Sequence, residues 1–544
     1  MRPRFANPMR AWLYVIVGVA ALLRFYPIWF GLPFAHARPD ETTALGLAGH
    51  IRGGDLNPHF FHWGSLTLYV FALVHGLAAA VRRVLGLDPA LSFTEMVVSA
   101  RATVALAGTL TVVVVYAAGR RMGGAVTGLL AALFLAVAIL HVRESHFAMT
   151  DALMTLLLTA SLALLLEGTE RTESGRDAYA RWFLAAGFAG GLAAATKYSA
   201  AAVLTAMGAA QVLLLARDRS RILSLGAWLP SAAFVLAFTA GFVTGTPYSI
   251  LDFTQFESDV RFDITHLSGG HGINLGRGWW YHLTYSLPYG LGIPTFAAAI
   301  AGIPFTIYRY PRHAFVLWTF AAAFYTSIGS GWTVFFRYIL PLLPVLCLSA
   351  AVFVVEVASR IAARAHIPPA AATIGLALLV AGPAFVNSLW FDILLSRTDS
   401  RVLAAEWLTP RLNAGDTLYD NGGSYAELNL TPAAIHRWQY DAALGRFVNA
   451  GDRTPDWLVL QESPLNPLPV LLEALARTGY DLVLTVTASA PKARSAVYDW
   501  QDAFFMPISG NGFIERPGPT IRIYRRRDGS SPLPAGTASP DTRR

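Results

Sequence analysis

The sequence predicts an α-helical protein that crosses a membrane many times and ends in a small soluble domain of mixed α/β structure. Of its 544 residues, 54% are hydrophobic and only 14% are charged. Apolar runs of about 20 residues, long enough to cross a bilayer, recur as far as residue 391. Beyond this point the composition is that of a soluble domain. Cys347 is the single cysteine and lies in an apolar run, so the soluble region has no disulfide.

Eleven apolar segments are predicted to cross the membrane. The first follows three arginines, as in a signal peptide, but its apolar run is too long for one, so we expect an uncleaved anchor. The eleven segments are residues 11–30, 97–119, 124–142, 151–167, 181–197, 199–216, 222–244, 284–307, 314–331, 336–358 and 370–391.

The orientation follows from arginines that gather in alternate loops. Because basic loops face the cytoplasm, the N-terminus is expected inside and, with eleven spans, the C-terminal domain outside the inner (plasma) membrane. Asp40 and Asp151 then share the outer face. The marking residues are Arg2, Arg4 and Arg10; Arg120 and Arg121; Arg171, Arg176 and Arg181; Arg217, Arg219 and Arg221; Arg309 and Arg312; and Arg360 and Arg364.

Residues 65–81 are apolar enough to form a further span, but a crossing here conflicts with this orientation. It would move Arg120-Arg121 to the outside and place Asp151 on the opposite face from Asp40. We therefore expect a shallow, juxtamembrane helix on the outer face.

The chain after the last span is predicted to form a small extracytoplasmic domain. A short helix at residues 401–408 precedes strand-like runs at residues 417–419, 457–461, 482–487 and 520–524. A polar end of the chain is predicted to be disordered. The predicted organisation is therefore residues 1–391 for the membrane domain, 392–526 for the soluble domain and 527–544 for the tail.

Two carboxylates lie at the ends of predicted membrane helices. Asp40 stands in Pro39-Asp40-Glu41 after the first span, and Asp151 closes the polar segment 141–151. Acids in membrane segments are costly and usually functional, although aspartate is also a good helix N-cap. A carboxylate can take the proton of an acceptor hydroxyl or amine. Asp40, Asp151 and the adjacent Glu41 are therefore the candidate catalytic residues.

Several polar side chains at predicted outer helix ends are suited to a phosphate. Arg337 lies in Phe336-Arg337-Tyr338, Lys197 in Thr196-Lys197-Tyr198, and His62 in Phe61-His62-Trp63. Tyr248, in the long outer loop at residues 246–283, is grouped with them. Cations can stabilise a departing phosphate. The alternative is that these side chains only reach toward lipid head groups.

Other ligands leave weaker signals in the sequence. No His/Asp cluster shows clear metal-ligand spacing, so a divalent metal stays possible without a predicted site. The net charge of +8 suits membrane topology and anionic head groups. Basic residues are not interleaved with exposed aromatic residues, so we expect no nucleic-acid partner.

Four stretches, which span most of residues 10–350, resemble a known family. They are Leu23-Arg24-Phe25-Tyr26 through Pro39-Asp40-Glu41; His146-Phe147-Ala148-Met149-Thr150-Asp151; Gly191-Leu192 through Lys197-Tyr198; and Phe336-Arg337-Tyr338 with Leu340-Pro341 and Pro344. In order and placement they resemble GT-C glycosyltransferases of the family 39 type, which includes bacterial protein O-mannosyltransferases and lipid A aminoarabinose transferases.

This resemblance implies a GT-C fold and an enzyme that moves a monosaccharide from a polyprenyl-phosphate donor to an envelope acceptor on the outer face. The acceptor can be a protein, a lipid or a polysaccharide, and hexose, pentose and amino sugars all stay open. The family's catalytic base falls on Asp40, its second acid on Asp151, and its phosphate-side arginine on Arg337. Some relatives use a metal. Where aminoarabinose enzymes have a lysine before the shallow helix, this chain has His62-Trp63, which weakens the case for phosphate contact there.

Two other classes of protein fit parts of the pattern. A secondary transporter or lipid flippase would also carry scarce charges in its membrane segments. In this chain, however, the charges gather at outer helix ends, and the long loops are predicted on one side only. A non-catalytic assembly scaffold would leave Asp40 unexplained. The expected partners are the lipid-linked sugar, an envelope acceptor and membrane lipids.

Overall fold

The computed structural model describes residues 8–173, 180–217, 222–431, 435–442, 445–448, 453–489, 496–502 and 504–527. The chain forms two compact units that exchange short segments. The first unit comprises Met1–Trp29, Asp40–Asp392 and Asp499–Asp502, and the second comprises Phe30–Pro39, Ile393–Tyr498 and Ala503–Arg544. Each unit is described separately.

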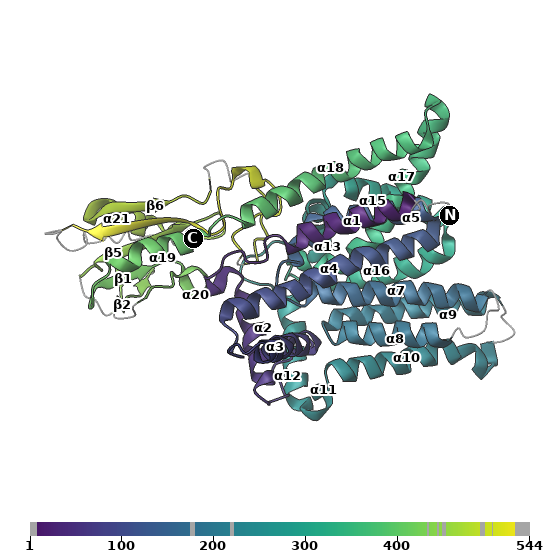
Figure 1. Cartoon of the computed structure of the whole chain (residues 1–544), viewed down its shortest axis with the longest axis horizontal. Coiled ribbons are helices and arrows are strands. Elements are labelled where there is room, and N and C mark those ends of the chain that lie inside the picture. Colours follow the sequence, from purple (N-terminus) through teal and green to yellow (C-terminus); the bar gives the residue numbers. More distant parts are fainter. Residues whose placement is uncertain are drawn as a thin grey trace, which may run out of the picture. The chain divides into compact units, whose positions relative to one another are not determined.

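The first unit is a bundle of apolar helices, and every segment predicted to cross the membrane is helical over most of its length (Figure 1). Its long helices are α1 (Pro8–Phe25), α4 (Phe93–Gly123), α5 (Ala125–Val137), α7 (Asp151–Glu173), α8 (Ala180–Ala194), α9 (Val203–Arg217), α10 (Leu225–Gly245), α15 (Ile293–Arg309), α16 (Pro311–Gly329), α17 (Leu343–Ala365) and α18 (Pro369–Leu395).

Length and apolar composition qualify seven helices of the described chain as membrane spans. A bent pair, Gly278–Leu291 with Ile293–Arg309, would make eight. The seven include Leu66–Val84, which is not among the predicted spans, whereas the predicted spans at 11–30, 124–142, 181–197 and 314–331 do not meet this criterion. The predicted fold class, a polytopic helical membrane protein with a small C-terminal domain, is confirmed.

Glycines allow α8 and α10 to pack with their backbones close together. A β-carbon at Gly187 would lie 2.2 Å from the carbonyl oxygen of Phe234, and one at Gly191 would lie 2.0 Å from that of Phe238. Small residues spaced by four along a helix are typical of tight packing between membrane helices. This packing fixes the end of α8, from which the chain continues to Lys197.

Helix α3 (Leu66–Val84) is the segment that hydropathy alone would count as a span. Figure 1 looks down the axis of α3, whereas it shows α4, α7, α8 and α10 from the side. At its start, the backbone N–H of Leu66 donates to the carbonyl oxygen of Ala195 over 3.0 Å. The helix therefore runs across the direction of these four helices from a fixed point at the end of α8, and its shallow placement in the membrane stays a prediction.

A buried ion pair attaches helix α2 (Pro39–Arg52) to the bundle. Arg101 of α4 donates through Nε and Nη2 to the two carboxylate oxygens of Glu41, over 2.9 and 2.6 Å. The backbone N–H of Ala148 also donates to Glu41, over 2.7 Å. Both charged side chains are 2% exposed. Glu41 thus holds α2 against α4 and against the loop that leads to Asp151.

The long loop predicted at residues 246–283 is largely helical. It contains α11 (Tyr248–Leu251), α12 (Phe253–Gly269) and α13 (Gly278–Tyr281). Asp259 of α12 accepts the backbone N–H of Phe61 over 2.7 Å. The ring of Phe61 lies 5.8 Å from that of Phe256. These contacts join the loop to the segment that precedes α3.

The second unit contains a five-stranded sheet with the order β2-β1-β5-β7-β6. Strand β1 is parallel to β2 and β5, and β7 is antiparallel to β5 and β6. The strands are β1 (Thr417–Asp420), β2 (His436–Arg437), β5 (Trp457–Glu462), β6 (Tyr480–Val486) and β7 (Thr520–Arg526), with helices α19 (Ser400–Leu408) and α21 (Val470–Gly479) and a separate pair β3 (Tyr440–Asp441) and β4 (Arg446–Phe447).

Alternate residues of the central strand β5 serve the two faces of this sheet. Trp457 and Val459 pack in the cluster that includes residues of α19, whereas Leu458 and Leu460 pack in the cluster that includes residues of α21. The predicted helix at 401–408 and the four predicted strands are all present. Of the predicted tail, residues 528–544 lie outside the described residues.

The Glu41–Arg101 pair gives a test of the fold. Replacing Glu41 by glutamine removes the carboxylate that pairs with the buried Arg101, and should lower the free energy of unfolding by about 3–5 kcal/mol. Glu257→Gln is the control, because Glu257 pairs with Arg261 at a surface where the two side chains are 52% and 77% exposed. Denaturant titration in detergent should show a far smaller loss for this control. Equal losses would contradict the anchoring role of Glu41.

Candidate active site

The first acid–cation pair joins the beginning of α2 to the beginning of α17. Asp40 lies in the first turn of α2, and Arg337 lies in η5 (Phe336–Leu342), a 3-10 segment that leads into α17. Nη1 of Arg337 donates to Oδ2 of Asp40 over 2.9 Å. The side chain of Asp40 is 36% exposed and that of Arg337 is 11% exposed. The carboxylate is therefore accessible while the guanidinium is largely covered.

The second acid–cation pair is more deeply placed. Asp151 is the first residue of α7, and Lys197 directly precedes η2 (Tyr198–Ala202), which leads into α9. Nζ of Lys197 lies 2.7 Å from Oδ1 of Asp151, whose side chain is 1% exposed. Within the described chain, Oδ2 of Asp151 is buried without a hydrogen-bond partner. A buried acceptor left unpaired is costly, and a ligand hydroxyl could satisfy it.

Two aromatic rings connect the pairs. The Arg337 guanidinium lies 4.6 Å from the ring centroid of Phe335, and the Lys197 ammonium lies 4.7 Å from that of Tyr338. The rings of Phe335 and Tyr338 are 5.3 Å apart. Cations over aromatic faces are attracted to the ring. The two carboxylates and two cations therefore form one continuous polar cluster at the end of the bundle.

Glu41 and His62 have other partners. The carboxylate of Glu41 is enclosed by Arg101 and the Ala148 N–H, so its place favours a positioning role over contact with a reacting atom. Nδ1 of His62 lies 3.0 Å from Oδ1 of Asp263 in α12. Burial raises the pKa of Asp263 to about 6, although the hydrogen bond with His62 opposes this shift. Asp263 also interacts electrostatically with Lys197. Through Asp263, His62 therefore lies next to the cluster of acids and cations.

Tyr248 lies apart from the other candidates. It begins α11 and is half-buried. In the ranges that the structure describes, no hydrogen bond or ion pair connects its hydroxyl with either acid–cation pair. Its electrostatic neighbour is Tyr69 of α3. The structure therefore does not group Tyr248 with Arg337 and Lys197.

The structure adds three residues that sequence reasoning did not identify. The Phe336 N–H donates to Oδ2 of Asp499 over 2.9 Å, and the Val334 N–H donates to Oε1 of Gln501 over 2.6 Å. Nη2 of Arg143 donates to Oδ2 of Asp502 over 2.9 Å. Burial raises the pKa of Asp499 to about 7. No local signal marks these residues, because their partners are more than 150 residues away along the chain.

The donor set of the cluster does not fit a resident metal ion. Among the described residues, no group of three or more His, Cys, Asp or Glu side chains is arranged to hold one. Asp40 and Asp151 each contact a cationic side chain instead. We therefore derive no chemical step through a metal.

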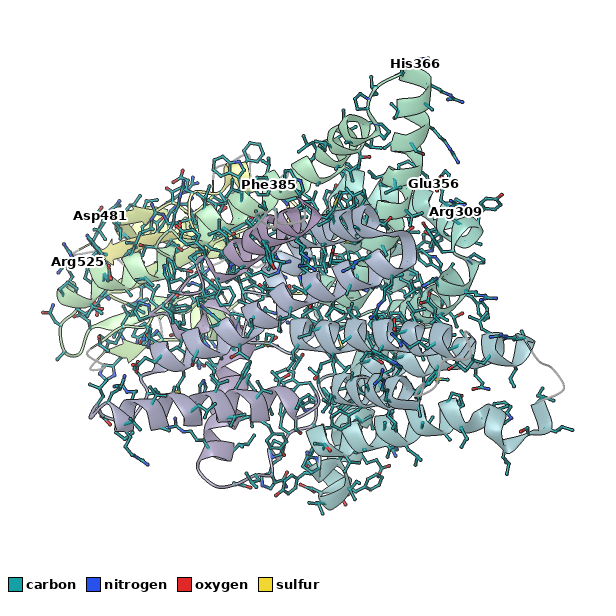
Figure 2. The ribbon with its side chains drawn as sticks, turned by 45° about the vertical axis from the view of Figure 1, so that its right-hand side comes forward. Arg309, Glu356, His366, Phe385, Asp481 and Arg525 are labelled. Atoms are coloured by element: carbon teal, nitrogen blue, oxygen red, sulfur yellow. The ribbon has the colours of Figure 1, made fainter. Side chains whose placement is uncertain are left out.

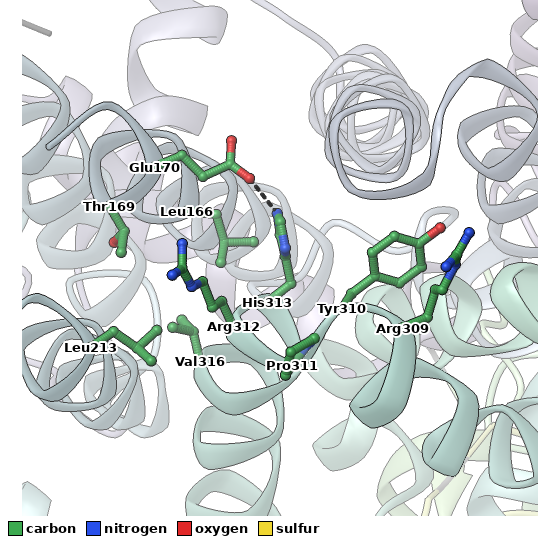
Figure 3. A pocket seen from close by; sticks show the side chains of 10 residues that line it. All are labelled: Leu166, Thr169, Glu170, Leu213, Arg309, Tyr310, Pro311, Arg312, His313 and Val316. Carbon is green, nitrogen blue, oxygen red and sulfur yellow. Dashed lines mark ion pairs between the residues drawn. The ribbon is translucent and has the colours of Figure 1, made fainter. Parts of the chain in front are cut away.

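A cavity of about 290 Å³ lies at the other end of α7, α9 and α16, and Figure 3 shows its lining. Asp151 and Glu170 are separated by about 28 Å along α7, at 1.5 Å per residue. His313 contacts Glu170 over 2.8 Å, and Arg309 lies 3.8 Å from Glu356 (Figure 2). Because Asp40, Asp151, Lys197 and Arg337 gather at the other end of the bundle, that end holds the candidate active site.

Part of the chain matches a known protein family. Residues 91–244, which include Asp151 and Lys197, match the family described as dolichyl-phosphate-mannose-protein mannosyltransferase. No curated protein sequence matches the chain.

Solved structures share the fold. The chain resembles ArnT from Cupriavidus metallidurans, bound to undecaprenyl phosphate, at 18% identity over 96% of this chain and 99% of that one, with a TM-score of 0.50. It also resembles the apo oligosaccharyltransferase of Archaeoglobus fulgidus at 10% identity, over 95% and 88% of the two chains, with a TM-score of 0.52. The predicted fold is confirmed: the chain has the GT-C fold, and residues 91–244 match a mannosyltransferase family.

Proposed function

We propose that this protein transfers a monosaccharide from a polyprenyl-phosphate donor to an acceptor of the cell envelope, on the outer face of the membrane. The observation that carries the proposal is the cluster in which an accessible carboxylate, Asp40, contacts a largely covered cation, Arg337. A base and a phosphate-binding cation are the two groups that such a transfer needs. The bound undecaprenyl phosphate of the structurally similar ArnT supports this class of donor.

The chemistry follows from the positions of the two groups. The carboxylate of Asp40 takes a proton from the acceptor hydroxyl or amine as that atom attacks the anomeric carbon of the donor. The bond from the anomeric carbon to the phosphate oxygen breaks, and the configuration at this carbon inverts. Polyprenyl phosphate leaves with the bonding electron pair, and Arg337 with Lys197 stabilises its negative charge.

The Asp40–Arg337 contact implies an exchange of partners. A guanidinium beside a carboxylate stabilises the ionised, proton-accepting form, but it also occupies one of the carboxylate oxygens. When the donor phosphate binds Arg337, that oxygen of Asp40 is released toward the acceptor. The binding of the donor thus prepares the base.

Asp151 is suited to a supporting role in the same site. One of its carboxylate oxygens holds Lys197, and the other has no hydrogen-bond partner in the described chain. That second oxygen can accept a hydrogen bond from a sugar or acceptor hydroxyl and so orient it. Lys197, held by Asp151 and placed over the Tyr338 ring, is in position to supplement Arg337 at the phosphate.

A lipid flippase or secondary transporter is the alternative that the sequence left open. Such a protein would also bind a lipid phosphate through cations. It would not need a base beside the phosphate site, so the requirement for the Asp40 carboxylate distinguishes the two functions.

Asp40→Asn should leave a folded protein whose rate of sugar transfer falls by about two to four orders of magnitude, the usual contribution of general-base catalysis. Asparagine keeps the size and the capping oxygen of aspartate, so a purely structural role predicts near-normal turnover. Asp55→Asn, at an exposed carboxylate beyond the end of α2, is the control and should retain activity. Transfer from one lipid-linked sugar should be measured with purified variants of matched thermal stability.

Arg337→Lys should weaken donor binding, because lysine keeps the charge but loses the planar fork that matches phosphate oxygens. Arg337→Ala should weaken it further. Arg309→Lys, at the far cavity, makes the same change and should bind the donor normally. The measurement is the affinity of purified protein for a prenyl-phosphate sugar. Wild-type affinity in both Arg337 variants would rule out the phosphate role.

A further inference from the structure

Arg337 follows an irregular segment, residues 330–335, whose backbone groups are not satisfied by a helix or a sheet. Buried backbone N–H and C=O groups need partners, so this segment depends on other parts of the chain. On one side, the N–H groups of Trp332 and Thr333 donate to the carbonyl oxygen of Leu267, over 2.9 and 3.2 Å. This contact attaches the segment to the end of α12.

The other partners of this segment come from residues 499–502. Asp499 accepts the Phe336 N–H, and Gln501 accepts the Val334 N–H. Nε2 of Gln501 also donates to the carbonyl oxygens of Ile273 and Trp332, over 3.0 and 3.2 Å. Gln501 is 6% exposed and Asp499 is 2% exposed. The side chains of Asp499 and Gln501 thus form hydrogen bonds with the backbone of every second residue, 332, 334 and 336, in the segment before Arg337.

An ion pair anchors the same short segment at its other end. Asp502 is 5% exposed and contacts Arg143, which also pairs with Glu144. The carboxylate of Asp502 acts electrostatically on Arg337 as well. Residues 499–502 are therefore fixed to helix α6 (Ile139–Glu144), which precedes Asp151, and to the segment that leads to Arg337.

We propose that Asp499 and Gln501 are positioning residues, which place the Arg337 guanidinium for the donor phosphate by fixing the backbone that precedes it. This inference rests on the proposed function. It gives residues 499–502 a part in donor binding, although their neighbours in the sequence belong to the second unit. A shift of Val334 or Phe336 would move Arg337 and the adjacent Phe335 ring together, because these residues are consecutive along the chain and the guanidinium lies over that ring.

The test is a mutant cycle in the full-length protein, with the affinity for undecaprenyl phosphate as the readout. Asp499→Ala leaves the Phe336 N–H buried without an acceptor, and should weaken binding about tenfold. Asp499→Asn should bind like wild type, because its amide oxygen can still accept the N–H. In an Arg337→Ala background, Asp499→Ala should cause no further loss, since it acts through Arg337.

Two further variants keep this test decisive. If Asp499→Ala does not fold, Gln501→Glu replaces it in the cycle, because glutamate still accepts the Val334 N–H but cannot donate to Ile273 and Trp332. Asp420→Ala is the matched control, since Asp420 of the second unit also accepts backbone N–H groups, from Gly422 and Leu428. Its affinity for undecaprenyl phosphate should equal that of wild type.

The possible outcomes separate this inference from the proposed function. An equal loss from Asp499→Ala in both backgrounds, or an equal loss in Asp499→Asn, would show a purely structural role and overturn the inference alone. Unchanged affinity in Arg337→Ala would instead remove the proposed phosphate role, and the inference with it.

Discussion

The contact between Asp40 and Arg337 is the interaction on which the proposed chemistry depends. The two residues are 297 positions apart in the sequence, and the pair joins the first loop of the chain to the beginning of α17. A charge placed alone at the end of an apolar bundle would be costly. Pairing of opposite charges lowers this cost, and in the proposed reaction a phosphate takes the place of Asp40 beside Arg337. In this proposal, Arg337 contacts Asp40 before the donor binds and contacts the donor phosphate afterwards.

Paired charges also build the scaffold around this contact. Glu41 with Arg101 fixes α2, and Asp502 with Arg143 fixes residues 499–502. Breaking such a buried pair leaves an uncompensated charge, so each pair specifies one arrangement of the helix ends. The acids and cations at this end of the bundle thus include enclosed pairs that position the backbone and the Asp40–Arg337 pair, whose carboxylate is accessible.

The sequence predicted the elements more fully than their contacts. Hydropathy located the long apolar helices of the bundle but not the helices of the loop at residues 246–283, and alternating basic loops indicated that α3 should not cross with the others. Asp40, Asp151, Lys197 and Arg337 were predicted near one another because helix ends of like orientation meet on one face. The roles of Asp499 and Gln501 were not predictable, since they depend on hydrogen bonds more than 150 residues away along the chain. Likewise, local sequence does not show that Glu41 is enclosed by Arg101, or that Tyr248 lies apart.

Mass spectrometry of envelope glycolipids and glycoproteins, from otherwise identical cells with and without this protein, tests the central claim most directly. A glycosyltransferase of the kind described here predicts that one envelope component loses the mass of a single monosaccharide when the protein is absent, while its polyprenyl-phosphate sugar accumulates. Unchanged envelope components, with a lipid-linked sugar redistributed between the two leaflets, would contradict transfer and indicate transport instead.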